Sequence, residues 1–135
     1  MKTTFDVLDK LYPVVNVTSV KATLDGAVYR NGRPEDSTVR DVVVLALPIP
    51  GGTDIDLQSC VVVINCFAKD LVAGVPDDTN LNAMSSAVIA VLEAYDSGTT
   101  YLHLEINSQG VMADMDASGI SYSSIRVNCT IQYAT

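Results

Sequence analysis

Residues 60–70, CVVVINCFAKD, are the stretch that decides the fold. Their β-branched side chains predict a strand. Successive residues of a strand point to opposite faces, and here both faces are largely apolar. We therefore expect a central strand that is covered on both sides, by a helix on one side and in part by a second subunit on the other. This makes Val61 and Val63 candidate subunit-interface residues. One face would carry Cys60, Val62, Ile64 and Cys66, and the other Val61, Val63, Asn65 and Phe67.

The preceding residues predict a second strand and a short helix. DVVVLALP, from Asp41 to Pro48, has the β-branched content of a strand and ends in proline, and Gly51-Gly52 after it predicts a turn. The segment from Thr3 to Leu11 has apolar residues at helical spacing, and we expect Pro13 to stop that helix. Residues 15–24 fit a strand or a helix. Residues 25–37 predict a short strand or hairpin followed by an exposed loop.

A long helix is predicted after Pro76, running to about Tyr95 before a stop signal at Gly98. Its capping candidates are Asp77, Asp78, Thr79 and Asn80. At 100° per residue the helix has a polar stripe, a stripe of large apolar residues, and a third stripe of alanines. Small residues allow a second element to approach closely, either inside the subunit or from another subunit, and both alternatives stay open. The alanine stripe, our second set of candidate interface residues, consists of Ala83, Ala87, Ala90 and Ala94.

The last third of the sequence predicts a long antiparallel hairpin. Residues 101–110 and 123–133 alternate between apolar and polar side chains, as in strands with one face in water. The connecting loop, VMADMDASGIS, is long for a hairpin, which favours a role in contacts. Together the elements predict a single α+β domain over residues 1–135. We expect an antiparallel sheet of about four to five strands, with one long helix and a short N-terminal helix packed on it.

Composition and charge exclude several functions. The chain is 48% hydrophobic and only 18% charged, and its mean hydropathy is +0.27, whereas about a quarter of the residues of a typical soluble domain are charged. The apolar runs are broken by Pro48, Pro50 and Asn65 well short of the ~20 residues of a membrane span. No signal peptide is expected, because Asp6 and Asp9 interrupt the apolar residues of the N-terminus. We therefore expect no membrane association, and infer that apolar surface is buried between subunits.

The net charge of −8 lies almost entirely in the second half of the chain. Residues 1–69 hold seven of the eight basic side chains against eight acidic ones, a balance of −1. Residues 70–135 hold only Arg126 against eight acidic side chains, a balance of −7. Binding to a phosphate backbone needs clustered basic side chains. The sequence therefore predicts no direct sequence-specific nucleic-acid binding.

The three cysteines predict buried, reduced thiols rather than a disulfide or a redox motif. Cys60 and Cys66 lie six residues apart in one predicted strand, about 20 Å and far beyond disulfide reach. With Cys129 they have apolar neighbours, as is typical of structural thiols in a protein made in a reducing compartment.

The sequence offers little catalytic chemistry. The single histidine, His103, shares a predicted strand face with Glu105, and Arg126 is a candidate partner across the hairpin. A His–carboxylate pair can act in general acid–base catalysis, but opposite charges on a sheet are also ordinary cross-strand partners. The pairs Asp77-Asp78 and Asp114–Asp116 lack the further ligands of a cation site. No nucleophile elbow, phosphate loop or zinc spacing is present. We expect no enzyme activity, no catalytic or metal-binding residues, and no cofactor.

The order of elements resembles a known family. GAVYRNGRPEDSTVRDVVVLAL, from Gly26 to Leu47, follows a short helix and precedes a strand pair, one Ala-rich helix and a long hairpin. This resembles the tail-terminator and tail-completion (minor tail, head–tail joining) proteins of long-tailed bacteriophages, including prophage copies. The resemblance implies a homo-oligomer, in that family a hexameric ring, that joins tail to head with other phage proteins. It implies no catalysis, a place in the virion, and synthesis in the bacterial cytoplasm.

An alternative function remains open. A small-molecule-binding or accessory α+β domain would need a pocket between helix and sheet, which we expect near Tyr95 and Tyr101. An enzyme would require His103 and Glu105 to line a cleft.

Overall fold

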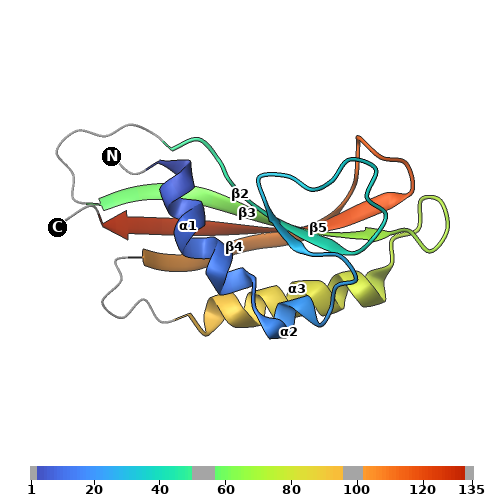
Figure 1. The fold of residues 1–135 in the computed structure, drawn as a ribbon, viewed down its shortest axis with the longest axis horizontal. Helices are drawn as coiled ribbons and strands as arrows, with labels where there is room; N and C mark the ends of the chain where they lie inside the picture. Colours follow the sequence, from blue (N-terminus) through green and yellow to red (C-terminus); the bar gives the residue numbers. More distant parts are fainter. Residues whose placement is uncertain (1–2, 50–56, 96–101, 133–135) are drawn as a thin grey trace.

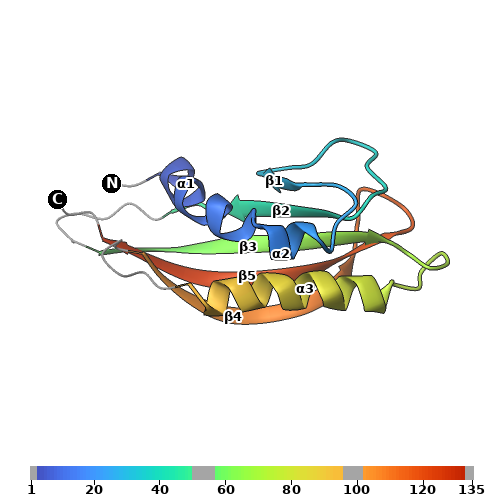
Figure 2. The same cartoon turned by 60° about the horizontal axis from the view of Figure 1, so that its bottom comes forward.

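The computed structural model describes residues 3–49, 57–95 and 102–132 as one mixed sheet with helices on one face (Figures 1 and 2). The predicted α+β class is confirmed. The turn predicted at Gly51-Gly52, the stop at Gly98, and Tyr101 lie outside the described residues. In chain order the elements are α1 (Thr4–Val15), α2 (Thr18–Lys21), β1 (Val28–Arg30), β2 (Asp41–Ala46), β3 (Leu57–Lys69), α3 (Asp78–Glu93), β4 (Leu102–Ala113) and β5 (Ile120–Gln132).

The five strands lie in the order β1-β2-β3-β5-β4. Strands β3 and β5 form an unbroken antiparallel ladder at the centre, from Leu57 opposite Gln132 to Lys69 opposite Ile120. The sheet is mostly antiparallel, as predicted, and departs from this at one pair: β1 runs parallel to β2. The physical reason is the connection between them. Residues 31–40 do not form a tight hairpin but carry the chain back to the end at which β1 began, so β2 starts in the same direction.

The core lies between the sheet and the helices. Val62, Ile64 and Cys66 of β3 are fully buried on the helix-covered face, as the alternation of the central strand predicted. Leu8 and Leu11 of α1 belong to the same buried cluster. In Figure 1, α1 crosses the strand direction and α3 runs along it. The α3 side chains in the cluster are Leu81, Met84, Val88 and Leu92.

The first helix is longer than predicted. Thr3 and Asp6 form a capping box at its start, and the helix continues through Pro13 to Val15. We predicted that Pro13 would stop it, and this was wrong. Proline removes the hydrogen bond to the carbonyl of Asp9, but Asp9 and Pro13 are exposed, so water can serve that carbonyl. Val15 is fully buried, and its burial holds the last turn in place.

The other predicted elements that fall on described residues are present in outline. Within residues 15–24, left open between strand and helix, Thr18–Lys21 form the short helix α2. The side chain of Asp77 caps α3 by accepting the backbone N–H of Asn80, as predicted. The C-terminal hairpin is present, but its register shifts between Ile106 and Ser108. The predicted alternation of β4 therefore holds from Leu102 to Ile106 and is displaced beyond the bulge.

The loop between β1 and β2 folds over the other face of the sheet and is held by a buried carboxylate. Asp41 is fully buried and accepts hydrogen bonds from Ser37 Oγ (2.6 Å), from the backbone N–H of Ala27 (3.1 Å) and from Arg33 (3.4 Å). Arg33 stacks 4.0 Å from the ring centroid of Phe67. A Cβ at residue 26 would overlap the Asp41 carboxylate, which explains the glycine there.

We expect Asp41→Ala to lower the free energy of unfolding by about 3 kcal/mol, because it removes the fully buried one of the two carboxylates paired with Arg33 and leaves the N–H of Ala27 without its acceptor. Urea denaturation measures the change. Asp9→Ala is the matched control: it removes the exposed ion pair with Arg30 (2.8 Å) and should change the value by less than about 1 kcal/mol. Equal effects of the two substitutions would contradict a structural role for the buried carboxylate.

Candidate subunit interface

The alanine stripe of α3 is divided between the interior and the surface. Ala87 is half-buried and packs against the core cluster. Ala83, Ala90 and Ala94 are exposed. Besides the sheet, α3 contacts α1 and α2. Packing against the core of the same subunit therefore explains the small residue at Ala87. The other three alanines form a solvent-facing flank of the helix.

The candidate residues of β3 differ in how much surface they keep. Val61 is half-buried, whereas Val63 is only 8% exposed. Val63 lies between Leu45 of β2 and Arg126 of β5 in the register of the sheet. Because a single chain already covers Val63, that residue has little area left for a partner. Val61 and the half-buried Leu45 keep more.

The edge strand β4 is a feature that the sequence did not reveal as an edge. Eleven of its twelve residues pair with β5 on one side, and in the described part of the chain no strand pairs with the other side. An edge of this length presents a row of backbone donors and acceptors to a further strand. Only the bulge after Ile106 interrupts it. Strand addition to such an edge is a common mode of protein association.

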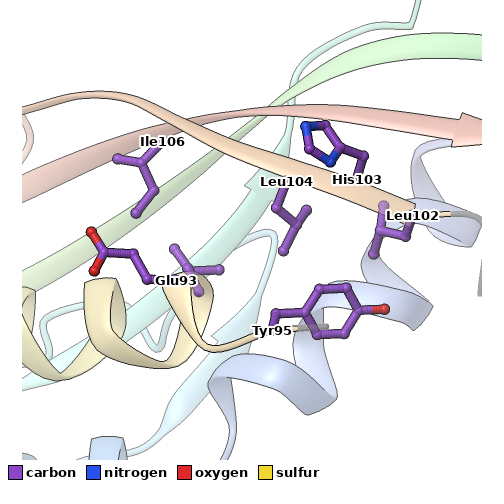
Figure 3. A pocket seen from close by; sticks show the side chains of 7 residues that line it. Glu93, Tyr95, Leu102, His103, Leu104 and Ile106 are labelled. Carbon is purple, nitrogen blue, oxygen red and sulfur yellow. The ribbon is translucent and has the colours of Figure 1, made fainter. Parts of the chain in front are cut away.

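A groove runs beside this edge, between α3 and β4. One hollow of about 320 Å³ lies at the C-terminal end of α3 and is drawn in Figure 3. There the side chains of Leu102 and Leu104 extend from β4 toward the helix and Tyr95, while His103 points to the other side of the strand. We define the α3–β4 groove as this hollow together with a second one of about 260 Å³ near the start of α3. Its half-buried apolar residues are Ile89, Tyr95, Leu104 and Ile106, and Val111 is 47% exposed.

Buried hydrogen bonds fix the second hollow in shape. The hydroxyl of Ser85 on α3 is hydrogen-bonded to that of Ser123 on β5 (2.6 Å) and to the carbonyl of Leu81 (2.7 Å). Gln109 of β4 donates to Ser123 Oγ (2.8 Å). Helix, central strand and edge strand are therefore joined by side chains as well as by packing. These hydrogen bonds hold the second hollow in a preformed shape.

Acidic side chains flank the groove. Asp78 lines one hollow and Glu93 the other. Neither α3 nor β4 contains a lysine or an arginine. The groove is therefore suited to an apolar partner with neutral or basic flanks.

The candidate catalytic residues do not form a cleft together. His103, Glu105 and Arg126 are all exposed. In the register, His103 lies opposite Thr130 and Glu105 opposite Asn128. Arg126 lies opposite Ser108, because the bulge displaces it along the strand. His103 borders the larger hollow, but Glu105 does not.

One carboxylate of each aspartate pair has a structural role. Asp77 accepts hydrogen bonds from the side-chain N–H of Asn80 (2.6 Å) and from the backbone N–H of Asn80. Asp114 accepts the backbone N–H of Asp116 (3.0 Å) and forms an ion pair with Arg33 (3.6 Å). Over residues 3–49, 57–95 and 102–132, no group of three or more His, Cys, Asp or Glu side chains is arranged to hold a metal ion.

The sequence matches no protein-family model, and it has no significant match among curated proteins. Within the described ranges, no helix combines the length and the apolar character needed to cross a membrane.

The alanine stripe provides a paired test. Ala87→Leu adds bulk at a half-buried position and should lower the free energy of unfolding by about 1–3 kcal/mol. Ala90→Leu, on the exposed flank, should change it by less than about 0.5 kcal/mol. Chemical denaturation of the two variants under one buffer gives both values. A large loss for Ala90→Leu would mean that a second molecule covers this flank under the conditions used.

Proposed function

We propose that this chain is a structural subunit that assembles with copies of itself into a ring, as a tail-terminator or tail-completion protein of a long-tailed bacteriophage. The observation that carries the proposal is the open edge strand β4 beside the α3–β4 groove. Within the described residues, no strand pairs with the outer backbone row of β4, and the apolar residues of the groove keep part of their surface in water. Covering both with another polypeptide satisfies the backbone and removes apolar surface from water.

A ring requires a head-to-tail contact between two different surfaces of the same molecule. The two edges of this sheet are different. At one edge is β4, with acidic groups on the adjoining groove. At the other is the three-residue strand β1, fastened to α1 by the ion pair of Arg30 with Asp9 and by the hydrogen bond of Tyr12 to Val28 (3.0 Å). The chain therefore offers two different sheet edges, as a head-to-tail contact requires.

The exposed lysines strengthen the case for a head-to-tail contact. Lys10 and Lys21 are exposed on α1 and α2, outside the acidic second half of the chain. A copy that presents α1 and α2 to the acidic groove of its neighbour brings unlike charges together, which favours the correct orientation on encounter. The proposed partners are therefore further copies of the chain, and after these the head and tail proteins that a ring would join. The proposed location is the virion, after synthesis in the bacterial cytoplasm.

The proposal is tested by the mass of the assembled protein. Native mass spectrometry and multi-angle light scattering across a wide concentration range should show a closed oligomer, with the hexamer as the expected species. A gene neighbourhood that encodes portal, capsid and tail-tube proteins would be the independent check. A protein that stays monomeric at every concentration, and whose gene lies among unrelated metabolic genes, would refute the proposal.

A substitution at the edge strand locates the contact. We expect Val111→Lys to reduce the assembled fraction severalfold, because it puts a charge on an edge strand where a neighbour would pack. Val39→Lys is the matched control, since Val39 is 41% exposed, close to the 47% of Val111, but lies in the β1–β2 loop. Sedimentation velocity measures assembly, and thermal denaturation shows that both variants fold. Unchanged assembly of Val111→Lys would exclude β4 from the contact.

The larger hollow favours a second candidate function, binding of a small molecule. The hollow has a volume of about 320 Å³ and is lined by Leu92, Tyr95 and Leu104, which is typical of a site for a small ligand. It lies beside Tyr95, where the sequence led us to expect a pocket. A thermal-shift screen of small apolar compounds tests this. Stabilisation of the unchanged protein that disappears in Leu104→Trp, which fills the hollow, would support it.

A further inference from the structure

Two cysteines that are distant in sequence face each other in the sheet. Cys60 of β3 lies opposite Cys129 of β5 in the antiparallel register. Their side chains share the helix-covered face of the sheet and are 6% and 1% exposed. Directly opposed residues of antiparallel strands have Cα atoms about 4.5–5.5 Å apart, which lies inside the range that a disulfide spans. The backbone therefore already holds the two positions at bonding range.

The two thiols also interact with each other. The hydrogen bond with Cys129 lowers the pKa of the Cys60 thiol, against the effect of burial. The same hydrogen bond, together with burial, raises the pKa of Cys129. Cys60 is thus the thiol that ionises first, and the Cys129 S–H stabilises its thiolate. A thiolate is the form that reacts with oxidants.

The third cysteine provides an internal contrast. Cys66 lies on the same face, six residues along β3, and is opposite Ser123 rather than a cysteine. Burial raises the pKa of the Cys66 thiol to about 12. It therefore stays protonated and has no cysteine opposite it in the ladder.

We propose that Cys60 and Cys129 form a dithiol site that a peroxide converts to a disulfide across the central ladder. The Cys60 thiolate attacks one oxygen of hydrogen peroxide, breaks the O–O bond, and becomes a sulfenic acid once the second oxygen has left as hydroxide. The sulfur of Cys129 then attacks the sulfenic sulfur, the S–O bond breaks, and the oxygen leaves as water with the Cys129 proton. In sum two thiols and one peroxide give one disulfide and two waters.

A small oxidant can approach the two cysteines through the α3–β4 groove. Leu104 lies opposite Cys129 in the pairing of β4 with β5, and it lines the larger hollow. The dithiol is therefore one strand away from solvent-accessible space. The disulfide would join the two central strands by a covalent bond and so resist their separation. The site is expected to stay reduced in a reducing compartment and to oxidise outside it. The inference does not depend on the proposed ring.

Peptide mapping of the folded protein tests the proposal. The native chain is treated with hydrogen peroxide, free thiols are blocked with an alkylating reagent, and the products are digested without reduction. We expect a linked peptide pair containing Cys60 and Cys129, with Cys66 alkylated only after denaturation. The intact mass should fall by two hydrogen atoms, and a reducing agent should restore it.

Variants show whether the pairing is specific. Cys66→Ser should form the link as the unchanged chain does, whereas Cys60→Ser and Cys129→Ser should form no intramolecular disulfide. Should either of the latter fail to fold, the map of the unchanged chain still decides the matter. A link through Cys66, oxidation of Cys60 beyond the sulfenic acid without a link, or three free thiols after peroxide treatment would each overturn the proposal.

Discussion

The antiparallel ladder between β3 and β5 is the constraint on which the rest of the structure depends. Its thirteen residue pairs join a strand from the middle of the chain to the last strand. Because these two strands occupy the centre of the sheet, every other described strand adds on one side or the other of the pair. The first half of the chain adds β2 and β1 at one side, and β4 adds at the other. The ladder also sets the face that is buried, since a slip of one residue between the strands would put Ile64 and Ile125 on opposite faces of the sheet.

Because of the ladder, the difference in charge between the two halves of the sequence becomes a difference between two sides of the sheet. The acidic second half supplies α3, β4 and β5, so acidic side chains gather beside the open edge. The basic side chains belong mostly to the first half, where several are joined to acids: Arg30 to Asp9, Arg40 to Asp25, and Arg33 to both Asp41 and Asp114. The ion pair of Arg33 with Asp114 links the β1–β2 loop to the tip of the C-terminal hairpin. A single mostly buried guanidinium thus holds together parts of the chain about eighty residues apart.

The two faces of the sheet are protected in different ways. Helices cover one face with apolar side chains, whose burial supplies the main driving force for folding. The other face is covered in part by the β1–β2 loop, where Arg33 lies over Phe67 and the Phe67 ring packs 5.1 Å from that of Tyr122. In the parts of the chain that the structure describes, no strand pairs with the outer side of β4. That asymmetry, rather than a large apolar patch, is the physical basis for expecting a partner.

The sequence by itself determined the elements and their buried sides, because hydrophobic periodicity and capping are local. It predicted β3, β5 and α3, the alternation of the central strand, and the Asp77 cap. Only the tertiary structure decided the strand order, the parallel β1–β2 pair and the place of β4 at an edge, since these depend on which distant segments pair. The continuation of α1 through Pro13 could not be predicted locally either, because it depends on the burial of Val15, which compensates for the hydrogen bond that proline removes. The approach of Cys60 to Cys129 has no local signal, because the chain separates these two residues widely and only the register of the central ladder brings them together.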